Sequence, residues 1–198
     1  MRVSGHALLK VRQKLAKGST ILDVGAGSGE HASWFKENGY DVKTTDILPG
    51  HDFVGDFNKI WYKGILVPHG QFDCIWCSHV LEHQLNPNQF LNAMLSLLKP
   101  GGIFAITVPP RKDRLVGGHV NLYTPLSLMY NLVLAHLDCS GASMKVYGYN
   151  ISVVTINNRL EHLPKLKFDN GDIETLSYLF PTEVKQNMNG FKYEGVNW

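Results

Sequence analysis

The stretch ILDVGAGSGE, residues 21–30, joins a short apolar run to glycines at three alternate positions, Gly25, Gly27 and Gly29. A backbone without side chains at this spacing can turn sharply and lets a ligand lie against the main chain, and we expect free amides of the loop to face that ligand. Asp46 follows 21 residues after Gly25, where a carboxylate at the end of the next strand can accept from both hydroxyls of a ribose. The sequence therefore predicts a binding site for a ligand that carries a ribose.

The residue that follows the third glycine argues against phosphate ligands. A dinucleotide-binding GxGxxG loop would have a glycine where this chain has Glu30, and a P-loop would end in GK[ST] where this chain has SGEH. A carboxylate repels a pyrophosphate but tolerates a ligand with a positive charge. We therefore expect a ribose-bearing ligand other than a nucleotide phosphate.

The elements around this loop alternate between helix and strand, which predicts a parallel sheet. The glycines lie where the first strand passes into a helix, at the edge of the sheet where ligands bind. Helices are expected over residues 6–17, 30–38, 87–99, 124–141 and 172–180. Strands are expected over residues 19–24, 40–47, 52–54, 72–78, 102–108, 144–156 and 190–198.

Composition limits the class of protein and of partner. The 198 residues are 44% hydrophobic with a formal net charge of +2, which predicts one globular domain with a core of its own. No block of about five or more like charges marks a basic arm, so we expect a small partner and no nucleic acid. The N-terminus lacks the apolar core of a signal peptide, and the apolar run 126–137 is too short to span a bilayer. We expect a soluble, cytoplasmic protein.

Cys74 and Cys77 form a CxxC pair, which in other contexts binds zinc or forms a short disulfide. Here the surrounding sequence FDCIWCS has the β-branched and aromatic content of a strand. Residues three apart in a strand point to opposite faces and cannot share a metal. We therefore expect two core cysteines.

The motifs LDVGAGSG, TTDI, GDF, FDCIWCSHVLEH and LLKPGGIFAITVPP together resemble those of class I S-adenosylmethionine-dependent methyltransferases, in the small-molecule branch with LEH after strand four. The resemblance covers residues 20–110. It implies a Rossmann-like α/β fold with helices on both faces of a seven-stranded mixed sheet in the order 3-2-1-4-5-7-6. The last strand would be antiparallel, and the segment 190–198 would supply it.

The same resemblance implies the cofactor, S-adenosylmethionine, with S-adenosylhomocysteine as product. Asp23 would lie near the amino group of the cofactor, and Asp46 would bind the ribose. Asp56 could instead cap the following turn. The remaining cofactor contacts implied by the resemblance are the loop residues Gly25, Ala26, Gly27 and Gly29 for the methionine part, Ile47, Asp56 and Phe57 for the adenine, and Ser78 and His79 beside the sulfonium.

Methyl transfer from a sulfonium depends mainly on orientation and desolvation and requires no metal. An oxygen acceptor with a high pKa would need a general base that titrates near neutral pH, which favours histidine. His119 and His83, with Tyr123, are the expected catalytic residues, although His83 could instead hold its loop in place. His79 and His83 have an HxxxH spacing without a third ligand at fixed spacing, so we expect no metal site.

Residues 111–142 form a long connection and helix after the fifth strand, which we expect on the acceptor side of the ligand edge. His119 and Tyr123 would face the acceptor. Arg111, Lys112 and Arg114 could bind an anionic acceptor such as a phosphorylated or carboxylated sugar, or they could form a solvated basic loop.

Other activities of this fold leave marks that the sequence lacks. DNA amino-methylating enzymes carry a Pro-Pro-aromatic motif after strand four, where this chain has CSHV. The predicted activity is O- or N-methylation of a small molecule. A protein that retains the cofactor site but serves as a non-catalytic partner subunit is the alternative, and a dehydrogenase is a more distant one.

Overall fold

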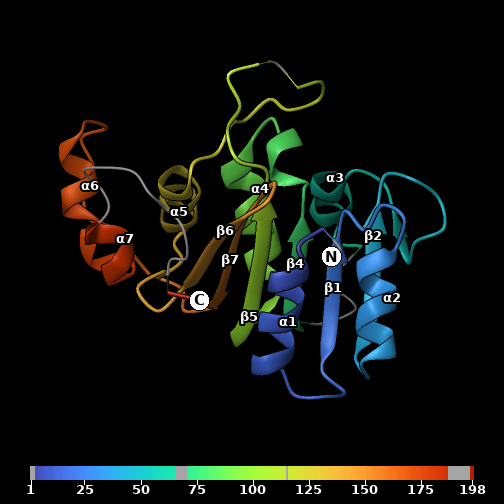
Figure 1. The fold of residues 1–198 in the computed structure, drawn as a ribbon. Helices are drawn as coiled ribbons and strands as arrows, with labels where there is room; N and C mark the ends of the chain where they lie inside the picture. Colours follow the sequence, from blue (N-terminus) through green and yellow to red (C-terminus); the bar gives the residue numbers. More distant parts are fainter. Residues whose placement is uncertain (1–2, 66–70, 115, 187–196) are drawn as a thin grey trace.

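The computed structural model describes residues 3–65, 71–114, 116–186 and 197–198, and its centre is a seven-stranded sheet (Figure 1). The strand order is β3-β2-β1-β4-β5-β7-β6. Neighbours from β3 to β5 pair in parallel, whereas β7 runs antiparallel to both β5 and β6. The predicted order and the single antiparallel strand are confirmed. The strands are β1 (Thr20–Val24), β2 (Asp41–Asp46), β3 (Phe53–Val54), β4 (Phe72–Ser78), β5 (Leu98–Val108), β6 (Ser143–Tyr147) and β7 (Asn150–Ile156).

Helices cover both faces of the sheet, because side chains alternate along each strand and both sets are apolar. On one face, α1 (Gly5–Lys14) and α2 (Glu30–Glu37) pack on one buried cluster. A second cluster on the other face contains residues of α3 (Phe57–Tyr62), α4 (Pro87–Ser96), α5 (Pro125–Leu134) and α7 (Thr182–Gln186), and α6 (Gly171–Thr175) lies beside α7 (Figure 1). Among the described helices, none combines the length and apolar content that crossing a membrane requires.

The two cysteines of the CxxC pair lie on opposite faces of β4. Cys74 belongs to the cluster under α1 and α2, whereas Cys77 belongs to the cluster under α4 and α5. Both side chains are buried, and neither is in a disulfide. The interpretation of the pair as core residues of a strand is confirmed.

The C-terminal half of the sheet differs from the prediction. The strand expected over residues 144–156 is a hairpin, in which Gly148 and Tyr149 connect β6 to β7. Gly148 has φ +51°, as a two-residue hairpin turn with glycine first requires. The antiparallel strand of the sheet is thus β7, not the segment 190–198. Of that segment, residues 190–196 lie outside the described residues, and residues 197–198 are not in a strand.

Several helices differ from the expected ones: α1 was expected to reach residue 17 and ends at Lys14, and α7 was not expected. The segment KPGG was expected to separate a helix from a strand, but α4 ends at Ser96 and the segment lies inside β5. Helix α5 was expected to reach residue 141 and ends at Leu134. Helix α3 was not expected at all. The predicted N-termini of α4 and α5 are confirmed, because Asn86 and Thr124 cap these helices with their side chains.

Candidate functional site

The glycine loop joins β1 to α2 at the edge of the sheet where the parallel strands end. All three glycines have positive φ, +72° at Gly25, +54° at Gly27 and +75° at Gly29. A Cβ atom on Gly25 would overlap the Val80 side chain, whereas a Cβ on the other two would meet open space. Gly25 therefore permits the close approach of the segment after β4, and Gly27 and Gly29 permit the left-handed backbone.

Four amides of the loop, those of Gly25, Ala26, Gly27 and Gly29, are bound to the protein, contrary to the expectation that they are free. The amides of Gly25 and Ala26 donate to the Thr45 carbonyl at 2.8 and 3.1 Å, and the Gly29 amide donates to the Ala26 carbonyl at 2.8 Å. The Gly27 amide donates to Asp46 Oδ2 at 2.8 Å. The end of β2 lies directly beside the loop and accepts three of these four bonds, two at the Thr45 carbonyl and one at the Asp46 side chain. The loop is therefore shaped before any ligand arrives.

Asp46 ends β2 beside the glycine loop, as the spacing predicted. Its Oδ2 accepts from the Gly27 amide, and its Oδ1 accepts from the Leu48 amide at 3.0 Å. An ionised carboxylate has about four acceptor positions, so each oxygen retains capacity for a ligand hydroxyl. The two backbone bonds orient the carboxylate toward the adjoining cavity, which it lines.

A cavity of about 650 Å³ adjoins Asp46. Ile47 is 72% exposed and presents an apolar surface to it, whereas Phe57 is only 7% exposed and packs edge-on against Phe90. Asp56 lines the cavity and also caps α3, where its side chain accepts from the Lys59 amide at 3.3 Å. The lining comprises Val24, Gly25, Gly27, Thr45, Asp46, Ile47, Leu48, Gly55, Asp56, Phe57, His79, Val80, His83, Gln84 and Gly118.

A second cavity of about 470 Å³ lies on the other side of the glycine loop. It shares Gly25, Gly27 and His79 with the first cavity, so the two meet at these residues. Its wall is polar and includes Ser78, whose hydroxyl lies 2.7 Å from that of Ser4. The remaining lining residues are Val3, Ala26, Ser28, Glu30, His31, Tyr149 and Asn150.

His79 stands at the junction of the two cavities, directly after β4. Its φ of +58° is unusual for a residue with a side chain and marks local strain of the kind found at functional sites. Nε2 lies 2.9 Å from Asn150 Oδ1, and Nδ1 lies 3.5 Å from Glu82 Oε1. Burial lowers the pKa of His79, but the Glu82 carboxylate and Asn150 raise it, and the net pKa is above the ordinary value. Two acceptors facing the two ring nitrogens favour the imidazolium.

Glu82 is the residue that the sequence analysis overlooked. Its side chain is fully buried in the 3₁₀ helix η2 (Leu81–His83), and neither carboxylate oxygen has a hydrogen-bond partner among the described residues. The carboxylate lies between His79 and His83. The motif HVLEH contained this signal, because a glutamate between two histidines at this spacing can face both in a tight helical turn.

The expected catalytic residues gather around Glu82. His83 Nδ1 lies 2.7 Å from the Gly118 carbonyl, so His83 holds the loop after β5 in place. The His119 ring lies edge-on to His83, with 5.0 Å between ring centroids, but His119 is absent from the lining of both cavities. Tyr123 is buried, and burial followed by the charge of Glu82 raises the pKa of its hydroxyl. His83 and His79 are thus the histidines of this group that reach a cavity wall.

One group of potential metal ligands occurs in the described part of the chain. Glu82, His83 and His119 place one ligand atom each within 4.8 Å of the others. The expectation of no metal considered only the pair His79 and His83, which lacked a third ligand. In the structure a third ligand is present, but it completes a set that excludes His79, because tertiary packing brings His119 onto η2.

Asp23 ends β1 underneath the glycine loop and is almost fully buried. Its Oδ2 has no hydrogen-bond partner among the described residues. Burial raises the pKa of Asp23 from the ordinary 3.8 to about 7, against the effect of the Ala32 amide, which donates to it. The carboxyl therefore holds its proton in the folded protein up to near-neutral pH.

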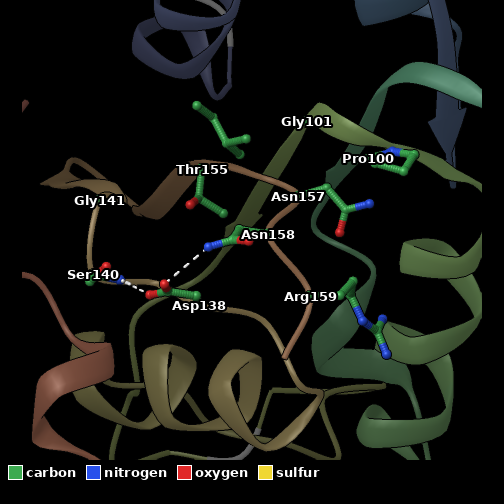
Figure 2. A pocket seen from close by; sticks show the side chains of 10 residues that line it. Pro100, Gly101, Asp138, Ser140, Gly141, Thr155, Asn157, Asn158 and Arg159 are labelled. Carbon is green, nitrogen blue, oxygen red and sulfur yellow. Dashed lines mark hydrogen bonds between the residues drawn. The ribbon is translucent and has the colours of Figure 1, made fainter. Parts of the chain in front are cut away.

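A third cavity, of about 620 Å³, lies at the opposite edge of the sheet (Figure 2). Pro100 and Gly101, in the first part of β5, and Ile156 at the end of β7 contribute to its wall. Asp138 accepts there from the Ser140 amide at 2.8 Å and from Asn158 Nδ2 at 3.1 Å. Because the glycine loop and Asp46 lie at the other edge, this cavity takes no part in the site described above.

Residues 2–130 match the family described as a methyltransferase domain. A ubiquinone biosynthesis O-methyltransferase of Bordetella avium is 30% identical over 116 residues, which cover 49% of this chain and 48% of the relative. The chain thus spans about half the length of the curated relatives that it matches.

Two solved structures share the fold. A chain in the complex between the Haloferax volcanii Trm112 methyltransferase activator and a methyltransferase aligns with a TM-score of 0.61 and 16% identity, over 79% of this chain and 89% of that one. The 1,6-didemethyltoxoflavin-N1-methyltransferase of Burkholderia thailandensis, solved with its substrate and S-adenosylhomocysteine, aligns with a TM-score of 0.58 and 20% identity, over 78% and 77%. At these identities the likeness concerns the fold alone.

The raised pKa of Asp23 predicts a pH-dependent stability. Between about pH 4 and pH 7 the folded protein keeps a proton that the unfolded chain has released, so the free energy of unfolding falls as pH rises. From about pH 5 to pH 8 we expect a loss of about 2 to 3 kcal/mol from this group. Asp23→Asn removes that loss, because it replaces the ionisable carboxyl with a neutral amide. Urea unfolding of both proteins at the two pH values measures it, and parallel pH profiles would contradict the assignment.

Proposed function

The chain belongs to the methyltransferase domain family, a family of S-adenosylmethionine-dependent enzymes, and from this premise we propose that it methylates a small anionic molecule. The observation that carries the proposal is the pair of cavities that meet at Gly25, Gly27 and His79. The name of the Bordetella avium relative supports a small-molecule acceptor and O-methylation. We assign the acceptor side to residues 111–142.

The residues of the two cavities fit S-adenosylmethionine in two parts. Asp46 has free acceptor positions for the ribose hydroxyls, and Ile47 offers an apolar surface to the adenine. On the other side of the loop, Glu30 offers a negative charge to the cationic amino-acid end. The adenosine would occupy the first cavity and the methionine part the second, with the reactive centre near His79.

S-adenosylmethionine supplies a methyl group that its sulfonium already activates toward nucleophiles. The protein then has to bind the acceptor in line with that methyl group and to exclude water, which is a matter of orientation and desolvation. The acceptor oxygen or nitrogen also has to release a proton as its new bond to carbon forms. A histidine at the cavity wall, or one that reaches it, can accept this proton at neutral pH.

His119 remains our proposal for the general base, with His83 as its rival. The nitrogens of His83 face the Gly118 carbonyl and the Glu82 carboxylate, at 2.7 and 3.8 Å. The ring of His119 makes no hydrogen bond with any described residue, so its nitrogens remain available. Its position on the loop after β5, against His83, supports access to the cavity that His83 lines.

We expect S-adenosylhomocysteine to stabilise the folded protein, whereas NAD and ATP do not, because Glu30 disfavours a pyrophosphate beside the loop. At a hundredfold excess over its dissociation constant, a ligand adds about 2.7 kcal/mol to the free energy of unfolding. Thermal unfolding with each ligand tests this expectation. A transition that shifts with NAD and not with S-adenosylhomocysteine would refute the proposed cofactor.

Substitution of Asp46 by Ala should weaken cofactor binding, because charge-assisted hydrogen bonds to the ribose contribute about 1.5 to 3 kcal/mol. We also expect Asp46→Ala to lower the free energy of unfolding by about 1 kcal/mol or more, because the carboxylate accepts from the Gly27 and Leu48 amides. Asp41→Ala, at the exposed start of the same strand, is the matched control. Calorimetry with S-adenosylhomocysteine measures both variants, and equal affinities would show that Asp46 does not bind the ribose.

His119→Ala should reduce single-turnover methyl transfer by about 10² to 10⁴ while the affinity for S-adenosylhomocysteine stays nearly unchanged, because a general base acts on the acceptor alone. His83→Ala should instead act through the loop that His83 holds and should alter acceptor binding as well. A normal rate for His119→Ala would remove His119 from the chemistry. Absence of turnover in the unsubstituted protein, with the cofactor bound, would favour the non-catalytic partner subunit.

A further inference from the structure

The turn between β6 and β7 borders the candidate site. Because β7 runs antiparallel to β5, its first residues lie beside the last residues of β5, and Ile151 pairs with Val108. Tyr149 and Asn150 are therefore held at the edge of the sheet where β4 and β5 also end. Both residues line the second cavity.

Three contacts connect this turn to the reactive centre and to the loop after β5. The rings of Tyr149 and His79 are stacked, with centroids 6.2 Å apart and 29° between their planes. Asn150 Oδ1 lies 2.9 Å from His79 Nε2. On the loop after β5, Lys112 Nζ lies 4.1 Å from the centroid of the Tyr149 ring. Tyr149 thus joins His79 to Lys112 along one wall.

Lys112 differs from the other basic residues of its loop. Arg111 faces the exposed carboxylate of Asp113 at 3.4 Å, and Arg114 is exposed and makes no ion pair with any described residue. Lys112 alone among these three packs on a residue of the cavity wall. A cation over an exposed aromatic ring gains only about 0.5 to 1 kcal/mol, so an anionic ligand can readily recruit the ammonium group.

Charges of opposite sign lie on the two sides of the second cavity. Glu30, at the start of α2, lies on the side of the glycine loop. Lys112 lies on the side of the hairpin turn, where its ammonium group contacts the Tyr149 ring. A cationic group therefore has a partner on the side of the glycine loop, and an anionic group has a partner on the side of the turn.

We propose that Tyr149 and Lys112 bind the methyl acceptor, and that the acceptor is a small carboxylate or phosphate whose ring packs on Tyr149. The inference rests on the proposed function and deepens it, because it identifies Lys112 as the cation of the loop that binds the anionic group and Tyr149 as the surface that binds the acceptor's ring. Tyr149 is 37% exposed, which leaves part of the ring accessible. An aromatic ring of the acceptor would stack on Tyr149 and extend the stack that Tyr149 forms with His79. The flat face of a pyranose packs on tyrosine in the same way.

Ligand-observed NMR on the protein saturated with S-adenosylhomocysteine tests the inference. The probes are benzoate and glucuronate, each paired with its neutral methyl ester, so that the charge and the type of ring are varied separately. We expect at least one of the two carboxylates to bind, and to bind more tightly than its ester. Lys112→Met should weaken that carboxylate about tenfold and leave the ester unchanged, as the loss of one charge-assisted contact predicts.

Two comparisons make the test specific. Arg114→Met, on the same loop, should retain the affinity for the carboxylate. An equal loss of affinity in Lys112→Met and Arg114→Met would show that the basic loop attracts anions nonspecifically, and it would overturn the inference. Tyr149→Leu should abolish binding of both members of the pair, while Tyr149→Phe preserves it. Unchanged binding to Tyr149→Leu overturns the role of the ring.

Failure of this inference is distinguishable from failure of the proposed function. Calorimetry with S-adenosylhomocysteine on Lys112→Met and Arg114→Met should give the affinity of the unsubstituted protein, because neither side chain lines the two cavities assigned to the cofactor. Tyr149 lines the second cavity, so its variants are compared only at saturating S-adenosylhomocysteine. If S-adenosylhomocysteine binds and no carboxylate does, the inference is wrong and the cofactor assignment stands. If S-adenosylhomocysteine does not bind, both are wrong.

Discussion

Hydrogen bonds between the end of β2 and the glycine loop are the constraint on which the site depends. The Thr45 carbonyl accepts from two successive loop amides, and Asp46 Oδ2 accepts from a third. The loop can follow the strand so closely only because its glycines adopt positive φ. Since Gly25 also leaves room for Val80, the same loop determines how near the segment after β4 can come. The positions of His79 and Glu82 follow from that approach.

The parts of the fold that the sequence predicted are those with strong local signals. The sequence of β4, FDCIWCS, is apolar and aromatic enough to define a strand at both ends. Asn86 and Thr124 mark helix starts by side-chain capping. The hairpin at Gly148 was missed because a two-residue turn interrupts an apolar run for too short a distance to alter its period. The start of β5 was misplaced because Leu98 already pairs with Phe72 of β4, and a register shift leaves KPGG between this pair and the next one, Cys74 with Ile103. Local sequence preference does not predict this pairing.

The residues of the candidate site likewise include some that the sequence predicts and some that only tertiary packing brings together. Asp46 could be found from its distance to Gly25, because both positions follow from the length of one strand–helix–strand unit. Glu82 could be found as a member of a motif, but its burial among histidines could not, since His119 arrives from a loop more than thirty residues away. The expectation of free amides was wrong because it considered the loop alone. The end of β2 accepts from the Gly25, Ala26 and Gly27 amides, and a turn within the loop accepts from the Gly29 amide.

The charges of the site also explain how a nearly neutral protein can discriminate between ligands. A formal net charge of +2 gives little long-range attraction for an anion, and physiological salt screens charges beyond about 8 Å. Discrimination must then come from charges at contact distance. Asp46 and Glu30 lie on either side of the glycine loop, while Lys112 lies on the side of the hairpin turn, against Tyr149. An arrangement of this kind favours two ligands of opposite charge bound side by side, and it disfavours either ligand in the place of the other.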